Sequence, residues 1–97
     1  MDAVEGRRGP RLLAELRGAL RLRHYSRRTE EAYVAWVRRF VRFVGMRHPR
    51  ELGEAEVRAF LSHLADPSGL SAASQNQAAS ALLFLYEHVV RRPMSPV

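Results

Sequence analysis

Cysteine and lysine are both absent from this chain of 97 residues. Without cysteine there can be no disulfide framework and no thiolate metal site, and the composition fits a reducing cytoplasm. No apolar run reaches the length of a membrane span, and residues 1–10 lack the apolar region of a signal peptide. The sequence therefore predicts a cytoplasmic protein without membrane contacts, and its length allows one small domain with a single core.

Arginine supplies all of the basic charge, because every one of the 16 basic residues is arginine, against 10 acidic residues. Residues 1–50 hold 13 arginines and 5 acidic residues, whereas residues 51–97 hold 3 arginines and 5 acidic residues. The two halves thus carry net charges of +8 and −2. A surface polarised in this way can steer a polyanion, and a planar guanidinium suits phosphate and guanine. A solvated helical surface without such a partner is the alternative, and charge alone does not exclude it.

Apolar residues recur at helical spacing in four stretches, and no stretch alternates with the period of two that is typical of strands. The pattern predicts an all-α bundle of four helices joined by short loops. Its helices are expected at residues 11–23, 27–44, 54–65 and 72–90.

Proline and glycine mark the ends of the predicted domain. Pro10 suits the first turn of a helix, so residues 1–10 are expected to be a flexible N-terminal tail. Gly45 is expected to end the second helix, and residues 66–69 form the clearest turn. The Arg-Arg-Pro sequence after Val90 ends the last helix, so residues 91–97 are expected to begin a linker.

One stretch, residues 24–40, combines a helix start, a basic edge and an aromatic face in the sequence HYSRRTEEAYVAWVRRF. Ser26 is predicted to cap the helix, and Glu30 and Glu31 to stabilise its first turn through the helix dipole. The buried face is predicted to contain Tyr33, Trp36, Val37, Phe40 and Val44. The opposite flank carries Arg28, Arg39 and Arg42.

Two groups of residues are candidates for nucleic-acid contacts. The first lies at the start of the second helix and on its flank, where amides and the dipole favour phosphate: Ser26, Arg27, Arg28, Thr29, Arg39 and Arg42. The second is an uncharged polar cluster at the start of the fourth helix, of a type that bonds base edges or phosphates: Ser74, Gln75, Asn76, Gln77 and Ser80.

The same residues also allow interpretations that do not involve DNA contacts. Arg27 could form an intrahelical pair with Glu31 instead of contacting DNA. Asn76 and Gln77 could serve only in capping or solvation. Tyr33 and Trp36 are assigned to the core, where they would position the arginines rather than touch DNA.

Catalytic and metal-binding signatures are missing. The four histidines show no metal-ligand spacing, no glycine-rich phosphate loop or nucleophile elbow is present, and no cofactor is expected. Glu30 and Glu31 point about 100° apart on a helix and do not form a paired carboxylate site. The sequence therefore does not predict an enzyme.

Three segments resemble the N-terminal, SAM-like core-binding domain of tyrosine recombinases, particularly integron-type integrases. They are HYSRRTEEAYVAWVRRF, HPRELGEAEVRAFLSHLA and SQNQAASALLFLYEHV, and the likeness spans Leu12 to Val90. The resemblance implies a four-helix SAM-like orthogonal bundle over residues 11–90. Such a domain forms one half of a clamp around double-stranded recombination-site DNA, with its second and fourth helices facing the major groove.

The same resemblance implies the partners. The strand-cleaving tyrosine would lie in a separate C-terminal catalytic domain of the same parent chain, so Tyr25, Tyr33 and Tyr86 are not expected to be nucleophiles. Other recombinase protomers would join in a synaptic assembly. The alternative function is a helical protein-interaction module that mediates this assembly, and an autonomous enzyme is disfavoured by the missing site.

Overall fold

The computed structural model describes residues 2–65 and 70–91, with side chains for all of these except residues 2–10 and Arg50. This part contains four α-helices and no strand, which confirms the all-α prediction. They are α1 (Asp2–Leu22), α2 (Arg27–Phe43), α3 (Glu54–Ala65) and α4 (Ala72–Phe84). A 3₁₀ turn, η1 (Pro49–Glu51), precedes α3, and a π-helical segment, η2 (Leu85–Val90), continues α4. Among the described residues, no helix is both long and apolar enough to cross a membrane.

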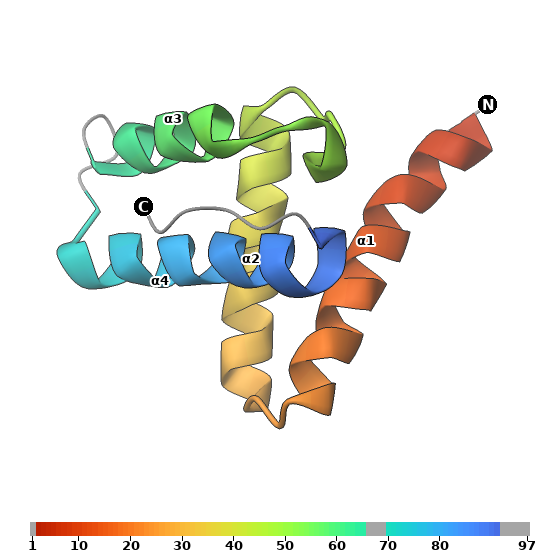
Figure 1. Ribbon diagram of the computed structural model, residues 1–97, viewed down its shortest axis with the longest axis horizontal. Coiled ribbons are helices and arrows are strands. Elements are labelled where there is room, and N and C mark those ends of the chain that lie inside the picture. Colours follow the sequence, from red (N-terminus) through yellow and green to blue (C-terminus); the bar gives the residue numbers. More distant parts are fainter. Residues whose placement is uncertain (1, 66–69, 92–97) are drawn as a thin grey trace.

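Helix α2 runs steeply across α3 and α4, which are roughly parallel to each other. In Figure 1, α1 and α2 meet at a short turn and diverge, and α4 crosses α2. Helix α2 packs against α4 and α1, and η2 packs back onto α1. This crossing brings α2 and α4 into contact although they are distant in sequence.

Each helix contributes an apolar stripe to one continuous core. The predicted inward faces are buried, including Leu16 and Leu20 of α1, Val37 and Phe40 of α2, and Leu64 of α3. Phe40 and Phe60 meet edge to face with ring centroids 5.5 Å apart, a favourable geometry for aromatic pairs. Helical spacing was therefore sufficient to predict which face of each helix is buried.

Helices α1 and α2 both end in a backbone motif that reverses the chain. After α2, Gly45 has a φ of +76°, and the Met46 amide donates to the Val41 carbonyl at 2.8 Å. After α1, His24 has a φ of +63°, and the Tyr25 amide donates to the Leu20 carbonyl at 3.1 Å. Both are Schellman caps, which need a left-handed residue. Glycine takes that role after α2, as predicted, whereas histidine takes it after α1.

The start of α1 differs from the prediction. Helix α1 begins at Asp2, so residues 2–10 are helical rather than a tail, and Pro10 lies inside the helix instead of in its first turn. A proline removes one backbone hydrogen bond, and most of the residues between Asp2 and Arg8 favour helix, which allows the preceding turns to form. The predicted turn at 66–69 and residues 92–97 of the predicted linker lie outside the described residues.

Small side chains allow α4 to approach its neighbours closely. Ser71 caps this helix by accepting a hydrogen bond of 3.2 Å from the Ser74 amide. Ala78 and Ala81 are fully buried one turn apart. Further along, the buried Tyr86 hydroxyl donates to the Pro49 carbonyl at 2.8 Å. The C-terminal helix is thereby tied to the loop before α3.

Candidate nucleic-acid interface

The first turn of α2 presents two exposed arginines. Ser26 caps the helix by accepting from the Thr29 amide at 3.1 Å, and its own hydroxyl donates to Thr29 Oγ1 at 3.0 Å. Arg27 and Arg28 follow this cap and are exposed. Neither forms an ion pair within the described residues, so the intrahelical Arg27–Glu31 pair is not made there. Both guanidinium groups are available beside the positive end of the helix dipole.

Glu30, next to these arginines, is a buried carboxylate bound by α1. It is 3% exposed. Arg17 donates to it from Nη1 at 2.8 Å, and Arg21 donates from Nε and Nη2 at 3.0 Å each. The hydrogen bonds from Arg21 and Arg17 lower the pKa of Glu30 to about 2. The bond from Arg21, which favours the charged guanidinium, in turn raises the pKa of Arg21.

The sequence did not predict these ion pairs of Glu30 with Arg17 and Arg21, because Glu30 was assigned only to the helix dipole. The signal was present in α1, because Arg17 and Arg21 are four residues apart and so share one face. Sequence spacing does not predict how α1 packs against α2, and it is this packing that brings Arg17 and Arg21 to Glu30. The ion pairs of Glu30 with Arg17 and Arg21 fix the first turn of α2, which carries Arg27 and Arg28, against α1.

Arg39 and Arg42 continue the basic edge along α2. The Arg39 guanidinium carbon lies 4.8 Å from the centroid of the Trp36 ring, a cation–π contact. Arg42 is exposed, and within the described residues it makes no ion pair. The flank predicted from helical spacing is therefore present on the surface.

The polar cluster of α4 divides into residues with and without partners inside the chain. Ser74 receives a hydrogen bond from Ser71, and the Gln75 amide nitrogen donates to the Leu70 carbonyl at 2.7 Å. Gln77 accepts from Trp36 Nε1 at 2.9 Å. Asn76 is exposed and makes no side-chain hydrogen bond among the described residues. Ser74 and Gln75 thus shape the start of the helix, while Asn76 is free to meet a ligand.

The Trp36–Gln77 hydrogen bond joins α2 to α4 at this surface. One turn before Trp36, burial and the nearby Tyr25 raise the pKa of Tyr33. The prediction that Tyr33 and Trp36 pack inward is confirmed, since Trp36 is buried and Tyr33 is half-buried. The crossing thus places the two candidate groups on adjoining helices.

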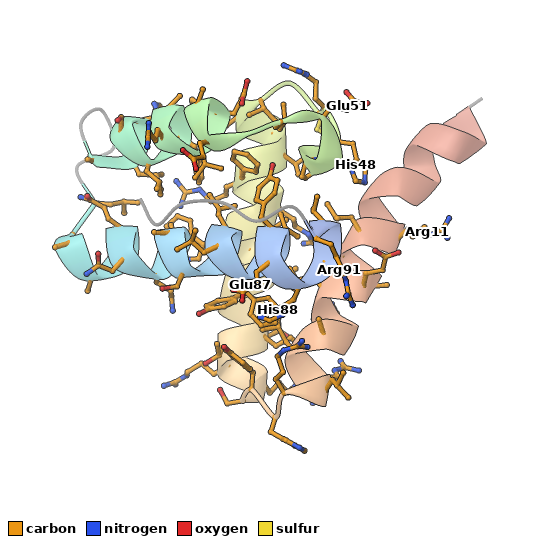
Figure 2. The ribbon with its side chains drawn as sticks, in the orientation of Figure 1. Arg11, His48, Glu51, Glu87, His88 and Arg91 are labelled. Carbon is orange, nitrogen blue, oxygen red and sulfur yellow. The ribbon has the colours of Figure 1, made fainter. Side chains whose placement is uncertain are left out.

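Across residues 11–65 and 70–91, histidine and carboxylate side chains do not converge on a metal site. In Figure 2, His48 and His88 lie on separate elements, near η1 and in η2 respectively. The described part of the chain holds no group of three His, Asp or Glu residues that could bind a metal ion. The candidate interface residues carry guanidinium, amide and hydroxyl groups instead.

Comparison with known proteins gives a consistent match. Residues 12–95 match the family described as phage integrase, N-terminal SAM-like domain. An integrase/recombinase of Escherichia coli and one of Pseudomonas aeruginosa are each 52% identical to this chain over 83 residues. That alignment covers 86% of this chain and 25% of either relative. The chain therefore spans about a quarter of the length of these relatives.

Proposed function

Because the chain belongs to the phage integrase N-terminal SAM-like domain family, we propose that it is the core-binding domain of a tyrosine recombinase. In this proposal residues 11–90 clamp double-stranded recombination-site DNA without catalysing its cleavage, and Arg91 begins the linker to a C-terminal catalytic domain of the same parent chain. The protein acts in the cytoplasm, where DNA integration and recombination take place.

One observation carries the proposal: the only two helices that bear the candidate residues are packed against each other. Helix α2 supplies exposed arginines at its first turn and along its edge, and α4, which packs against α2, supplies amide and hydroxyl groups. Arginines suit phosphate oxygens, and amides suit base edges. The same surface therefore offers both backbone anchoring and sequence reading.

A gel-shift titration of the 97-residue chain against duplex DNA at several salt concentrations tests this function. Arginine–phosphate contacts release counterions, so we expect binding that weakens steeply as salt rises. The logarithm of the association constant should fall linearly with the logarithm of the salt concentration. Absence of binding to any duplex, even at low salt, would overturn the proposal.

A second function, assembly with other recombinase protomers, is favoured by a different surface. Phe43 and Met46, at the end of α2, are 41% and 67% exposed. The Phe43 ring also lies 5.2 Å from His63 of α3, centroid to centroid. Exposed apolar side chains of this kind occur at protein interfaces. Light scattering with and without DNA separates the functions, because self-association without DNA affinity would favour assembly.

A further inference from the structure

Trp36 connects the two helices of the proposed DNA surface. Its indole belongs to α2 and is 8% exposed, and its Nε1 atom donates to Oε1 of Gln77 in α4 at 2.9 Å. Gln77 itself is exposed. The hydrogen bond therefore runs from a core side chain to a surface amide, and it restricts how that amide can turn.

The chemistry of the indole fixes which end of the amide faces inward. An indole N–H donates and cannot accept, so the amide atom that meets it has to be the oxygen. The Gln77 NH₂ group is then directed away from Trp36. Within the described residues this NH₂ group donates no hydrogen bond, which leaves two donors for a ligand.

A second donor lies against the same indole. The exposed Arg39 guanidinium stacks on the Trp36 ring at 4.8 Å from its centroid. A cation–π contact holds a guanidinium over the ring face. Trp36 thus contacts one donor group from each of the two helices, and it offers no acceptor of its own to a ligand.

We propose that Trp36 is a positioning residue that makes Gln77 a donor-only reader of DNA. The inference rests on the proposed function, namely DNA binding through α2 and α4. Glutamine reads adenine through two bonds, in which the amide oxygen accepts from N6 and the NH₂ group donates to N7. Here that oxygen faces inward and accepts from Trp36, so the NH₂ group is the part of the amide turned toward a ligand. Gln77 therefore selects a hydrogen-bond acceptor, as guanine presents with O6 and N7, adenine with N7 and thymine with O4, and it disfavours cytosine, which presents only the N4 donor in the major groove.

A phosphate oxygen is also an acceptor, and the experiment has to distinguish it from a base. The probe is a pool of duplexes with a randomised centre, bound by the 97-residue chain at low salt and sequenced before and after selection. Four variants are compared with the wild type: Gln77→Glu, Gln77→Met, Trp36→Phe and Ala73→Glu. Circular dichroism and thermal melting establish that each variant is folded.

Each variant isolates one part of the arrangement. Gln77→Glu still accepts from Trp36 but has no donor, whereas Gln77→Met has neither group. Trp36→Phe removes the indole N–H and leaves Gln77 free to turn. Ala73→Glu is the charge control, because residue 73 is exposed and lies one turn before Gln77 on the same face of α4.

We expect the wild type to disfavour cytosine relative to guanine, thymine and adenine at one position, by about 10-fold for a well-placed contact. Gln77→Glu should shift that position toward cytosine or adenine, which offer donors. Gln77→Met should lose the preference, and Trp36→Phe, which frees the amide oxygen to accept from the cytosine N4 group, should admit cytosine. Ala73→Glu should weaken all sequences alike and leave the preference intact.

Three results would overturn the inference while leaving DNA binding in place. They are a wild type without any base preference, a Trp36→Phe variant with the wild-type preference, and a Gln77→Glu variant that only weakens all sequences equally. The last result would assign Gln77 to phosphate. If Trp36→Phe does not fold, the contrast between Gln77→Glu and Gln77→Met decides the matter. A chain that binds no duplex at all would instead overturn the proposed function.

Discussion

Glu30 and Arg21 are joined by two hydrogen bonds of 3.0 Å, from Nε and Nη2 of the guanidinium to the two carboxylate oxygens. Bidentate pairs of this kind are geometrically specific and stronger than neutral hydrogen bonds. Because the pair bridges α1 and α2, it orients the turn of α2 on which Arg27 and Arg28 lie. It also links the stability of the fold to pH.

The first prediction concerns that pH dependence. The pKa of Glu30 is lowered from 4.5 to about 2 in the folded chain. A carboxyl with a lowered folded pKa stabilises the fold above its unfolded pKa, and this contribution is lost as the pH falls toward the folded value. We expect Glu30→Gln to lower the melting temperature at pH 7, and the difference from wild type to shrink as the pH falls from 4.5 toward 2.

Glu31→Gln is the matched control for Glu30→Gln. Glu31 is the next residue along the helix, but its side chain is 61% exposed and reaches Arg17 only at 3.9 Å. Exposed pairs contribute little to stability. Thermal melts of both variants across this pH range should show a pH-dependent decrease in melting temperature for Glu30→Gln alone. Equal decreases for both variants would contradict a buried, ion-paired Glu30.

The second prediction uses the two left-handed caps. His24 has a φ of +63° in the cap after α1, a conformation that costs a residue with a side chain more than it costs glycine. His24→Gly should raise the free energy of unfolding by up to about 1 kcal/mol. Gly45→Ala, at φ +76°, should lower it by about 1 kcal/mol, since no neighbour lies within 4 Å to add a clash. Urea denaturation of both variants should show changes of opposite sign in the free energy of unfolding.

Gly18→Ala separates this conformational effect from helix propensity. Gly18 lies inside α1, has no left-handed φ, and an added Cβ would meet nothing within 4 Å. Alanine should therefore stabilise the chain there by about 0.5–1 kcal/mol. A destabilising Gly18→Ala would show that packing, rather than backbone conformation, governs these glycines.

The third prediction concerns the buried hydroxyl of Tyr86. It donates to the Pro49 carbonyl at 2.8 Å, and deleting it leaves a buried acceptor without this donor. Tyr86→Phe should lower the free energy of unfolding by about 1–3 kcal/mol. Tyr25→Phe is the comparison, because Tyr25 is 39% exposed. Removing its hydroxyl should change the free energy of unfolding by less than about 0.5 kcal/mol. Chemical denaturation of the pair provides the measurement.

The fourth prediction divides anchoring from reading within the proposed DNA surface. Arg28→Ala should weaken binding to all duplexes and reduce the salt slope by about 1, as loss of one phosphate contact does. Asn76→Ala should instead reduce discrimination between sites, because an exposed asparagine suits base edges. Titrations of both variants against several duplexes at several salt concentrations test the division. If the two variants behave alike on every duplex, the assignment of roles is wrong.

Local signals in the sequence were enough to predict most of the fold. The bounds of α2 and the start of α4 follow from Ser26, Gly45 and Ser71, whose effects reach only a few residues. Core faces follow from apolar spacing within each helix. The start of α1 was misplaced because Pro10 suits a first turn, whereas in the structure it lies inside the helix, where proline costs about 3 kcal/mol.

Contacts between helices could not be predicted in the same way. Glu30 was expected to act on its own helix dipole, and Gln77 to face a ligand or solvent, because neither sequence spacing nor propensity specifies a crossing angle. Only the packed structure brings Arg21 to Glu30 and Trp36 to Gln77. The candidate residues could therefore be named from the sequence, while their orientation could not.

Ala78 and Ala81 make the proposed DNA-binding surface rigid. At these two fully buried positions α4 packs through methyl groups, which have no alternative rotamers, and close-packed cores resist deformation. We expect α2 and α4 to meet the duplex as one rigid body, without induced fit between them. The distance between anchoring and reading groups is then set before binding, so the duplex has to bend or twist to match it, and sequences that deform easily gain affinity even at base pairs the protein never touches.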